Sequence, residues 1–174
     1  MRETELMIEG GGFPPFSARG CHQVLTPIRN GEYRRTIEGR LIFIGNETHH
    51  KYRTKIHGQD KTIPAIEKWW RGGQVHVGCI QRLCQEFLGD GIQKSISLAR
   101  LPIEGSVVVF DEAKENAKVL KVQEAEVILE EVPPKGKRLF ISYRPLLEMM
   151  MTHHTIETDE WGHQVGWTLE LEEV

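Results

Sequence analysis

Residues 142–174, SYRPLLEMMMTHHTIETDEWGHQVGWTLELEEV, decide the fold of this chain. Positions 165–171 alternate between large apolar side chains and Gly, Thr or Glu. This period of two is the pattern of a strand with one buried face and one solvent face. Residues 146–156 are also compatible with a strand, and turn-forming residues lie between the two segments at 159–162. We therefore expect a long β-hairpin that runs to the last residue, and nothing in it indicates catalysis.

The composition is that of an ordinary globular protein with a hydrophobic core. Of the 174 residues, 39% are hydrophobic and 27% are charged, and the formal net charge is −3. This weak charge gives no general attraction to nucleic acid or to an anionic membrane. No apolar run approaches the roughly 20 residues that span a bilayer, and the first residues lack the apolar segment of a signal peptide. We therefore expect neither secretion nor membrane contact, and an odd count of three cysteines favours reduced thiols.

Residues 1–20 are predicted to form an N-terminal arm. Three glycines are followed by two prolines, and Phe13 and Phe16 are candidate aromatic anchors. The arm either lies across its own domain or reaches a neighbouring subunit. No composition shift divides the rest of the chain, so residues 21–174 are expected to form a single β-rich domain.

Several strands are predicted in the first third of the chain. Residues 23–28 and 33–36 flank Asn30-Gly31, which is a strong hairpin signal. The apolar run at 41–44 is short and bounded by glycines, which is typical of a strand buried on both faces. Residues 46–60 are mostly polar, and we expect them to form a surface segment.

One short α-helix is predicted, at about residues 62–71. Thr62 is a suitable N-cap, Pro64 would lie in the first turn, and two glycines follow at 72–73. Trp69 does not fit the apolar stripe of this helix and is expected at a rim or an interface. The stripe itself would hold Ile63, Ile66 and Trp70.

The remaining segments add further strands. We expect strands at 74–83, at 106–110 and, with a bulge, at 119–132. The turn at 133–137 should join the last of these to a strand at 138–143 in a second hairpin. The sequence therefore predicts a mainly β fold, a β-sandwich or barrel with long hairpins and one short helix.

The residues with reactive side chains do not form a known catalytic or metal-binding motif. The histidine pairs 49–50 and 153–154 would each point to opposite faces of a strand. Cys79 and Cys84 lack the two-residue spacing of zinc knuckles. There is no Gly-x-Ser-x-Gly motif. We expect no catalytic residue, no metal and no cofactor.

Basic and acidic residues are concentrated in different parts of the chain. A basic group with interleaved tyrosines is typical of surfaces that bind single-stranded nucleic acid or an acidic protein partner. It consists of Tyr33, Arg34, Arg35, Arg40, Lys51, Tyr52, Arg53 and Lys55. The acidic residues Glu170, Glu172 and Glu173 lie at the other end of the chain.

Several segments together resemble small virion structural proteins of tailed bacteriophages. These segments are PPFSARG (14–20), RRTIEG (34–39), KYRTKI (51–56), WRGGQVHV (70–77) and DEWGHQVGWTLELEEV (159–174). The resemblance covers most of the chain. It implies a component of the tail or baseplate near the tail tip, similar to tail-tube or distal-tail proteins. Such proteins form rings of a β-sandwich or barrel with one helix, and their hairpins line or brace the tube.

The expected function is therefore that of a non-enzymatic tail or baseplate ring subunit. The resemblance implies a homo-oligomeric ring, as a hexamer, made in the host cytoplasm and located in the virion tail. It also implies contacts with other tail or baseplate proteins, with nucleic acid only as passing cargo.

Two alternatives stay open: a nucleic-acid-binding β-barrel and a small metal-dependent hydrolase. We expect either the basic segment 49–55 or the N-terminal arm of one subunit to contact the acidic C-terminal strand of the next subunit. The predicted interface residues are Phe13, Phe16, Lys51, Arg53, Lys55, Trp69, Glu170 and Glu172.

Overall fold

The structure is a computed structural model of the chain. It describes residues 4–10, 12–15, 17–29, 31–45, 50–66, 69–161 and 164–174. All fourteen elements of this described part are β-strands, so the mainly β prediction is confirmed. The chain divides into two compact units. Unit 1 comprises Met1–Glu9 and His76–Leu147, and unit 2 comprises Gly10–Val75 and Glu148–Val174. That residues 21–174 form a single domain stays a prediction, because a division into compact units does not show whether each unit folds independently.

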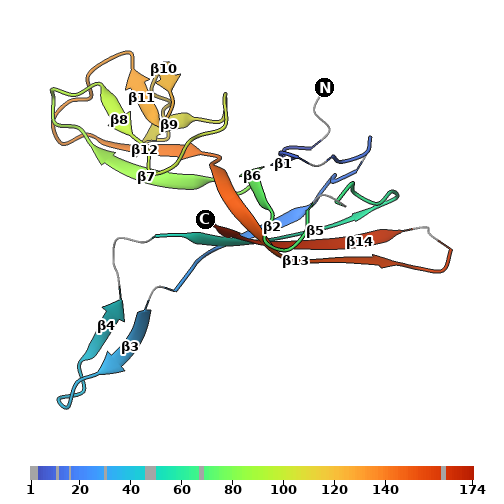
Figure 1. Cartoon of the computed structure of the whole chain (residues 1–174). Helices are drawn as coiled ribbons and strands as arrows, with labels where there is room; N and C mark the ends of the chain where they lie inside the picture. The colour runs from blue at the N-terminus through green and yellow to red at the C-terminus, as the bar shows by residue number, and fades with distance from the viewer. Residues whose placement is uncertain are drawn as a thin grey trace. The chain divides into compact units, whose positions relative to one another are not determined.

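The largest sheet has six strands in the order β1-β6-β13-β14-β5-β2 (Figure 1). Its strands are β1 (Met7–Ile8), β2 (His22–Pro27), β5 (Tyr52–Asp60), β6 (Gln74–Gly78), β13 (Leu146–Thr158) and β14 (Val165–Glu173). The long C-terminal hairpin predicted from the sequence is confirmed, since β13 and β14 pair in antiparallel register along their length. A bulge between Met151 and His153 shifts this register once.

One face of this sheet forms the core of unit 2. On β14, the four apolar residues of the alternating pattern, 165, 167, 169 and 171, are all buried. Met149 and Met151 of the neighbouring strand β13 are buried as well. On β5, Ile56 is fully buried, and the other inward positions are Thr54, Gly58 and Asp60.

A buried carboxylate connects three segments of this core. Asp60 accepts a hydrogen bond from Trp167 Nε1, 2.6 Å from Oδ2. The backbone N–H of Ala18, from the segment expected to be an N-terminal arm, donates to both carboxylate oxygens at 2.9 Å. Gly58 leaves the space that the ring of Trp167 occupies: a Cβ there would lie 2.5 Å from Cζ2 of the indole. The arm therefore packs on its own chain at this point.

Unit 1 is built from two three-stranded antiparallel sheets. One has the order β7-β12-β9, with β7 (Leu83–Leu88), β9 (Val108–Asp111) and β12 (Arg138–Tyr143). The other has the order β10-β11-β8, with β8 (Ser95–Ser97), β10 (Val119–Gln123) and β11 (Glu126–Leu129). They share a core of Ile96, Leu98, Val109, Val127, Leu129, Leu139, Ile141 and Tyr143.

The predicted helix at about 62–71 is wrong. The described residues 62–66 and 69–71 contain no helix. The Ala65 N–H donates to the carbonyl of Gly12, and Gly72 and Gly73 exchange backbone hydrogen bonds with Met151. Ala65 and the two glycines that follow the segment therefore bond to distant parts of the chain, and these bonds together with the burial of Trp69 outweigh the local helix signals.

The expected apolar stripe of that helix is also wrong. Trp69 is 1% exposed, whereas Trp70 is 71% exposed and Ile63 is 51% exposed. Trp69 contacts the ring of Phe13 at a centroid distance of 6.0 Å. Without a helix, the period of 3.6 that placed Trp70 inside does not apply.

Two other local expectations for the first 60 residues need correction. Residues 46–60 are not a surface segment throughout: positions 52–60 form β5, in the interior of the large sheet. Their alternation escaped notice because only Ile56 among the inward residues is a large apolar side chain. Strands β2 and β3 (Gly31–Arg35) do not form a hairpin, since β2 pairs with β5 and β3 pairs with β4 (Leu41–Gly45). Asn30 of the expected turn lies outside the described residues.

The expected strand at 119–132 is a hairpin of two strands. β10 and β11 turn at 124–125, where Glu124 has a φ of 51°. The expected hairpin across 133–137 is wrong as well, because β12 pairs with β7 and β9 instead of β11. Both errors arise because sequence alternation shows where strands lie but not which strands pair.

Substitution of Gly58 tests the packing of the unit 2 core. Gly58→Ala would force a Cβ into the indole of Trp167, and we expect it to lower the free energy of unfolding by about 1–3 kcal/mol. Gly12→Ala is the matched control, because a Cβ at Gly12 meets nothing within 4 Å. Urea denaturation followed by tryptophan fluorescence measures both. Equal stability of the two variants would contradict this account of the core.

Candidate interaction surface

The β3–β4 hairpin forms a two-stranded sheet of its own. Tyr33 lies opposite Phe43, and their rings are 5.2 Å apart between centroids. Arg34 lies opposite Ile42 and forms an ion pair of 3.1 Å with Glu32. Neighbours in a strand alternate between faces. β4 is therefore apolar on both faces, while β3 is largely charged.

The tip of this hairpin is closed by local hydrogen bonds. The backbone N–H of Thr36 donates to the carbonyl of Arg40 at 2.9 Å. Gly39 has a φ of 82°, a left-handed conformation that glycine adopts without strain, and Arg35 donates to its carbonyl. Ile37 at the tip is fully exposed. The hairpin is thus a defined ribbon that carries apolar side chains in water.

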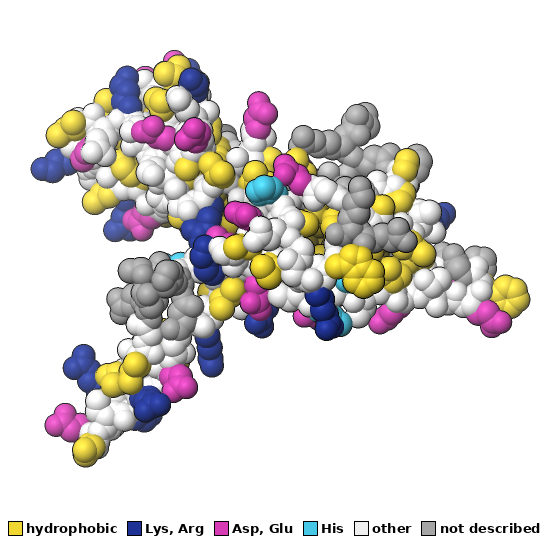
Figure 2. Space-filling view, in the orientation of Figure 1, with side chains coloured by type: hydrophobic (Ala, Val, Ile, Leu, Met, Phe, Trp, Pro, Cys, Tyr) yellow, Lys and Arg dark blue, Asp and Glu magenta, His cyan; other side chains and the backbone are white. Residues whose placement is uncertain are grey.

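Residues 41–44 were expected to form a strand that is buried on both faces. In the single chain this expectation is wrong, because these residues are exposed. The side chains of Leu41, Ile42, Phe43 and Ile44 are exposed by 53%, 37%, 40% and 53%. Hydrophobic, basic and acidic side chains all reach the surface along this hairpin in Figure 2. The sequence of β4 is therefore that of an interior strand, while its environment is that of a surface strand. Within the described part of the chain, no third strand pairs with either outer edge of this sheet.

The large sheet has one face on the core and one face in solvent. Basic and acidic residues that were predicted at an interface meet on the solvent face. Arg53 Nε donates to Glu172 Oε1 at 2.8 Å, and Lys55 Nζ donates to Glu170 Oε1 at 2.9 Å. These four residues, which we call the charge ladder, join β5 to β14 within one chain. The expected contact between subunits is not needed to account for them, and their role in assembly stays a prediction.

Further contacts extend this pairing to the end of the chain. Lys51 Nζ donates to the carbonyl of Val174 at 2.6 Å, and the backbone N–H of Tyr52 donates to Glu173 at 2.9 Å. The hydrogen bond from Lys55 lowers the pKa of Glu170, with smaller contributions from the charges of Lys55, His153 and Arg53. The basic segment 51–55 is thus engaged by carboxylates and a carbonyl of its own chain.

The aromatic residues predicted at the interface lie on or in unit 2. Phe13 is half-buried, with its ring 5.6 Å from that of Trp167 and 6.0 Å from that of Trp69. Trp69 is buried, so it presents no surface to a partner. Phe16 lies outside the described residues. From the sequence, the hydrophobic contact surface was predicted in the arm, and the exposed apolar hairpin was not predicted. The flanking charges in RRTIEGR (34–40) were the available signal against burial of the neighbouring apolar run.

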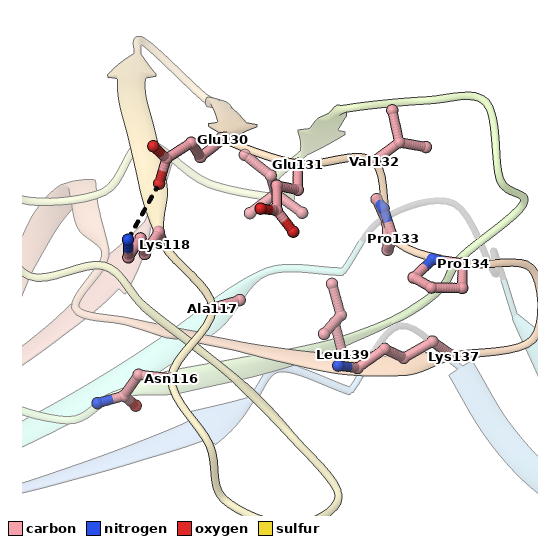
Figure 3. A pocket seen from close by; sticks show the side chains of 11 residues that line it. Asn116, Ala117, Lys118, Glu130, Glu131, Val132, Pro133, Pro134, Lys137 and Leu139 are labelled. Carbon is pink, nitrogen blue, oxygen red and sulfur yellow. Dashed lines mark ion pairs between the residues drawn. The ribbon is translucent and has the colours of Figure 1, made fainter.

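Unit 1 contains a shallow cavity of about 270 Å³ (Figure 3). Leu129, Leu139 and Pro133 supply apolar walls, and Lys118 and Glu130 form an ion pair of 3.8 Å at its margin. Lys137, which also lines the cavity, forms an ion pair of 3.1 Å with Asp111.

In the described ranges, no group of three or more His, Cys, Asp or Glu side chains is placed to hold a metal ion. In those same ranges, no helix is long and apolar enough to cross a membrane. Cys79 is buried, Cys21 is half-buried and Cys84 is exposed, and none of the three is in a disulfide.

Comparison with known proteins adds no assignment. No family model matches the chain, and no curated protein shows significant similarity to it.

The charge ladder predicts a pH-dependent contribution to stability. Lys55→Met removes the donor to Glu170, and we expect a loss of about 0.2–1 kcal/mol at neutral pH, since the pair is partly exposed. The folded-state pKa of Glu170 is lowered. Its ionisation therefore stabilises the fold above the ordinary glutamate pKa of about 4.3, and this contribution disappears as the pH falls through the lowered pKa.

Urea denaturation from neutral to acid pH measures this effect. The difference between the wild type and Lys55→Met should shrink as the solution is acidified below the ordinary pKa of glutamate. Lys118→Met is the control, because Lys118 is 85% exposed and 3.8 Å from its partner. A difference that stays constant with pH would show that the Lys55 side chain acts through packing instead of charge.

Proposed function

We propose that this chain is a non-enzymatic structural subunit of a bacteriophage tail or baseplate and that copies of it assemble into a ring. The observation that carries the proposal is the β3–β4 hairpin, whose second strand has an interior sequence and an exposed environment. The segments similar to virion structural proteins support it, and two of them, at 34–39 and 51–56, lie in or next to this hairpin.

The energetics favour a partner for this strand. Full burial of one Leu, Ile or Phe side chain stabilises by about 1.5–3 kcal/mol. Four such side chains, each about half exposed, would contribute roughly 3–6 kcal/mol on burial. Association costs roughly 4–15 kcal/mol, so one hairpin contact alone would be weak. A closed ring gives every subunit two such contacts, because one patch meets a different patch on the next copy.

The free backbone edge of β4 suits the same arrangement. An exposed, apolar edge strand is prone to pair with a strand of another chain. Pairing of this kind supplies backbone hydrogen bonds, while the side chains on both faces of the added strand supply the buried area. The outer edge of β3 or another strand of the next copy would complete the sheet.

The remaining parts of the proposal follow from the resemblance. The ring would be a hexamer with a β-sandwich or barrel architecture in each subunit. It would be made in the host cytoplasm, be located in the virion tail, and contact other tail or baseplate proteins. Nucleic acid would pass through the ring as cargo. The engagement of Lys51, Arg53 and Lys55 within their own chain disfavours the alternative of a nucleic-acid-binding surface at this segment.

Variants of the hairpin test the proposal. Ile42→Asp combined with Ile44→Asp places charges on one face of β4, and we expect it to abolish oligomers without unfolding the chain, since both side chains are already exposed. Native mass spectrometry across protein concentration, with electron microscopy, measures assembly. Circular dichroism checks the fold.

Ile92→Asp is the matched control. Ile92 is 80% exposed and lies outside the hairpin, so assembly should be unchanged. Rings that form equally well with the substituted hairpin would refute its role, and a wild-type chain that stays monomeric at every concentration would refute self-assembly of the isolated protein.

A further inference from the structure

Two histidines that are far apart in the sequence lie side by side on the large sheet. His22 of β2 is directly opposite His57 of β5 in the antiparallel register. Both side chains are exposed. Their ring centroids are 5.2 Å apart, with an angle of 47° between the ring planes.

This separation suits chelation of one metal ion. A zinc–imidazole bond is about 2.0–2.1 Å long, which places the ion roughly 3.2 Å from the centre of each ring. Two ring centres that are 5.2 Å apart then subtend roughly 110° at the ion, close to the tetrahedral angle that zinc adopts. Rotation of the exposed side chains about χ1 and χ2 can bring one nitrogen of each ring toward this point without movement of the strands.

The surroundings leave the two imidazoles available. Among the described residues, neither ring takes part in a hydrogen bond or an ion pair. The nearest charged position on the same face of β5 is Lys55, whose ammonium group is held by Glu170 at 2.9 Å. Across β14, the residue opposite His57 is Thr168, which is uncharged and small. The site therefore has room for an ion with its water ligands.

We propose that His22 and His57 chelate one divalent transition-metal ion, such as Zn²⁺, Ni²⁺ or Cu²⁺, with water in the remaining positions. Imidazole is a preferred ligand for these ions. Two protein ligands are fewer than the three or four of catalytic and structural zinc sites, so the affinity is modest and the open positions can accept a ligand from another molecule. The proposal is independent of a role in a phage tail.

This pair could not be recognised from histidines that are adjacent in the sequence. Adjacent residues of a strand point to opposite faces, whereas His22 and His57 share a face through the pairing of β2 with β5. No sequence pattern indicates that the two histidines are neighbours until the pairing of β2 with β5 is known.

Isothermal titration of the untagged full chain with ZnCl₂ tests the site. We expect one ion per chain, and we expect His22→Ala and His57→Ala each to weaken binding by about tenfold or more, because a single imidazole cannot chelate. His76→Ala is the control: His76 pairs with Glu9 at 2.9 Å elsewhere in the chain, and its loss should leave the affinity unchanged.

NMR of the wild-type chain gives a readout that needs no variant. The imidazole signals of His22 and His57 should be the first to shift as Zn²⁺ is added, and Zn²⁺ should raise the melting temperature of the wild type but not of His22→Ala. Equal affinity in the wild type and both alanine variants would overturn the proposal. A first shift at other histidines, or an equal loss of binding in His76→Ala, would also overturn it.

Discussion

The buried carboxylate of Asp60 is the constraint on which unit 2 depends. A buried polar group is costly unless it is hydrogen-bonded, and the carboxyl oxygens of Asp60 accept hydrogen bonds from the indole N–H of Trp167 and the backbone N–H of Ala18. These bonds hold β5, β14 and the segment before β2 together. Gly58 completes the arrangement, since only a residue without a Cβ leaves space for the indole at this position.

The pairing of β14 with β5 also determines which side chains lie next to each other on the solvent-facing side of the sheet. Once Trp167 faces the core, alternation sends Glu170 and Glu172 of β14 to the other face, opposite Lys55 and Arg53 of β5. The pairing of β2 with β5 places His22 against His57 on this face. The β3–β4 hairpin lies between β2 and β5 in the chain. In the described part of the chain, the apolar side chains of β4 are exposed, which is why we propose that they contact other copies.

Much of the fold could be predicted from alternation alone. Where both the period and the apolar residues are clear, as in β14, the strand and its buried face were predicted correctly. β5 was missed because its inward residues include Thr54, Gly58 and Asp60, whose burial depends on hydrogen bonds and on a neighbouring ring. The false helix at 62–71 had good local signals, but the backbone bond from Ala65 to Gly12, and those between Met151 and the two glycines after the segment, could not be seen in the sequence.

The residues that form the candidate surfaces could be predicted from the sequence, but the contacts that these residues make could not. The basic and acidic segments were identified, and the structure pairs Arg53 with Glu172 in one chain. The apolar run of β4 was identified as an interior strand, and it is exposed. Sequence thus indicates which side chains need partners, while strand pairing decides whether the chain itself provides them.

The central claim is that β4 becomes an interior strand when copies of the chain assemble. Hydrogen–deuterium exchange of the amides of Leu41–Gly45, compared between dilute monomer and concentrated assembly, tests it most directly. The account predicts that these amides exchange more slowly in the assembly, while those of the β5–β14 core are protected in both states. Equal exchange of the β4 amides in monomer and assembly would contradict it.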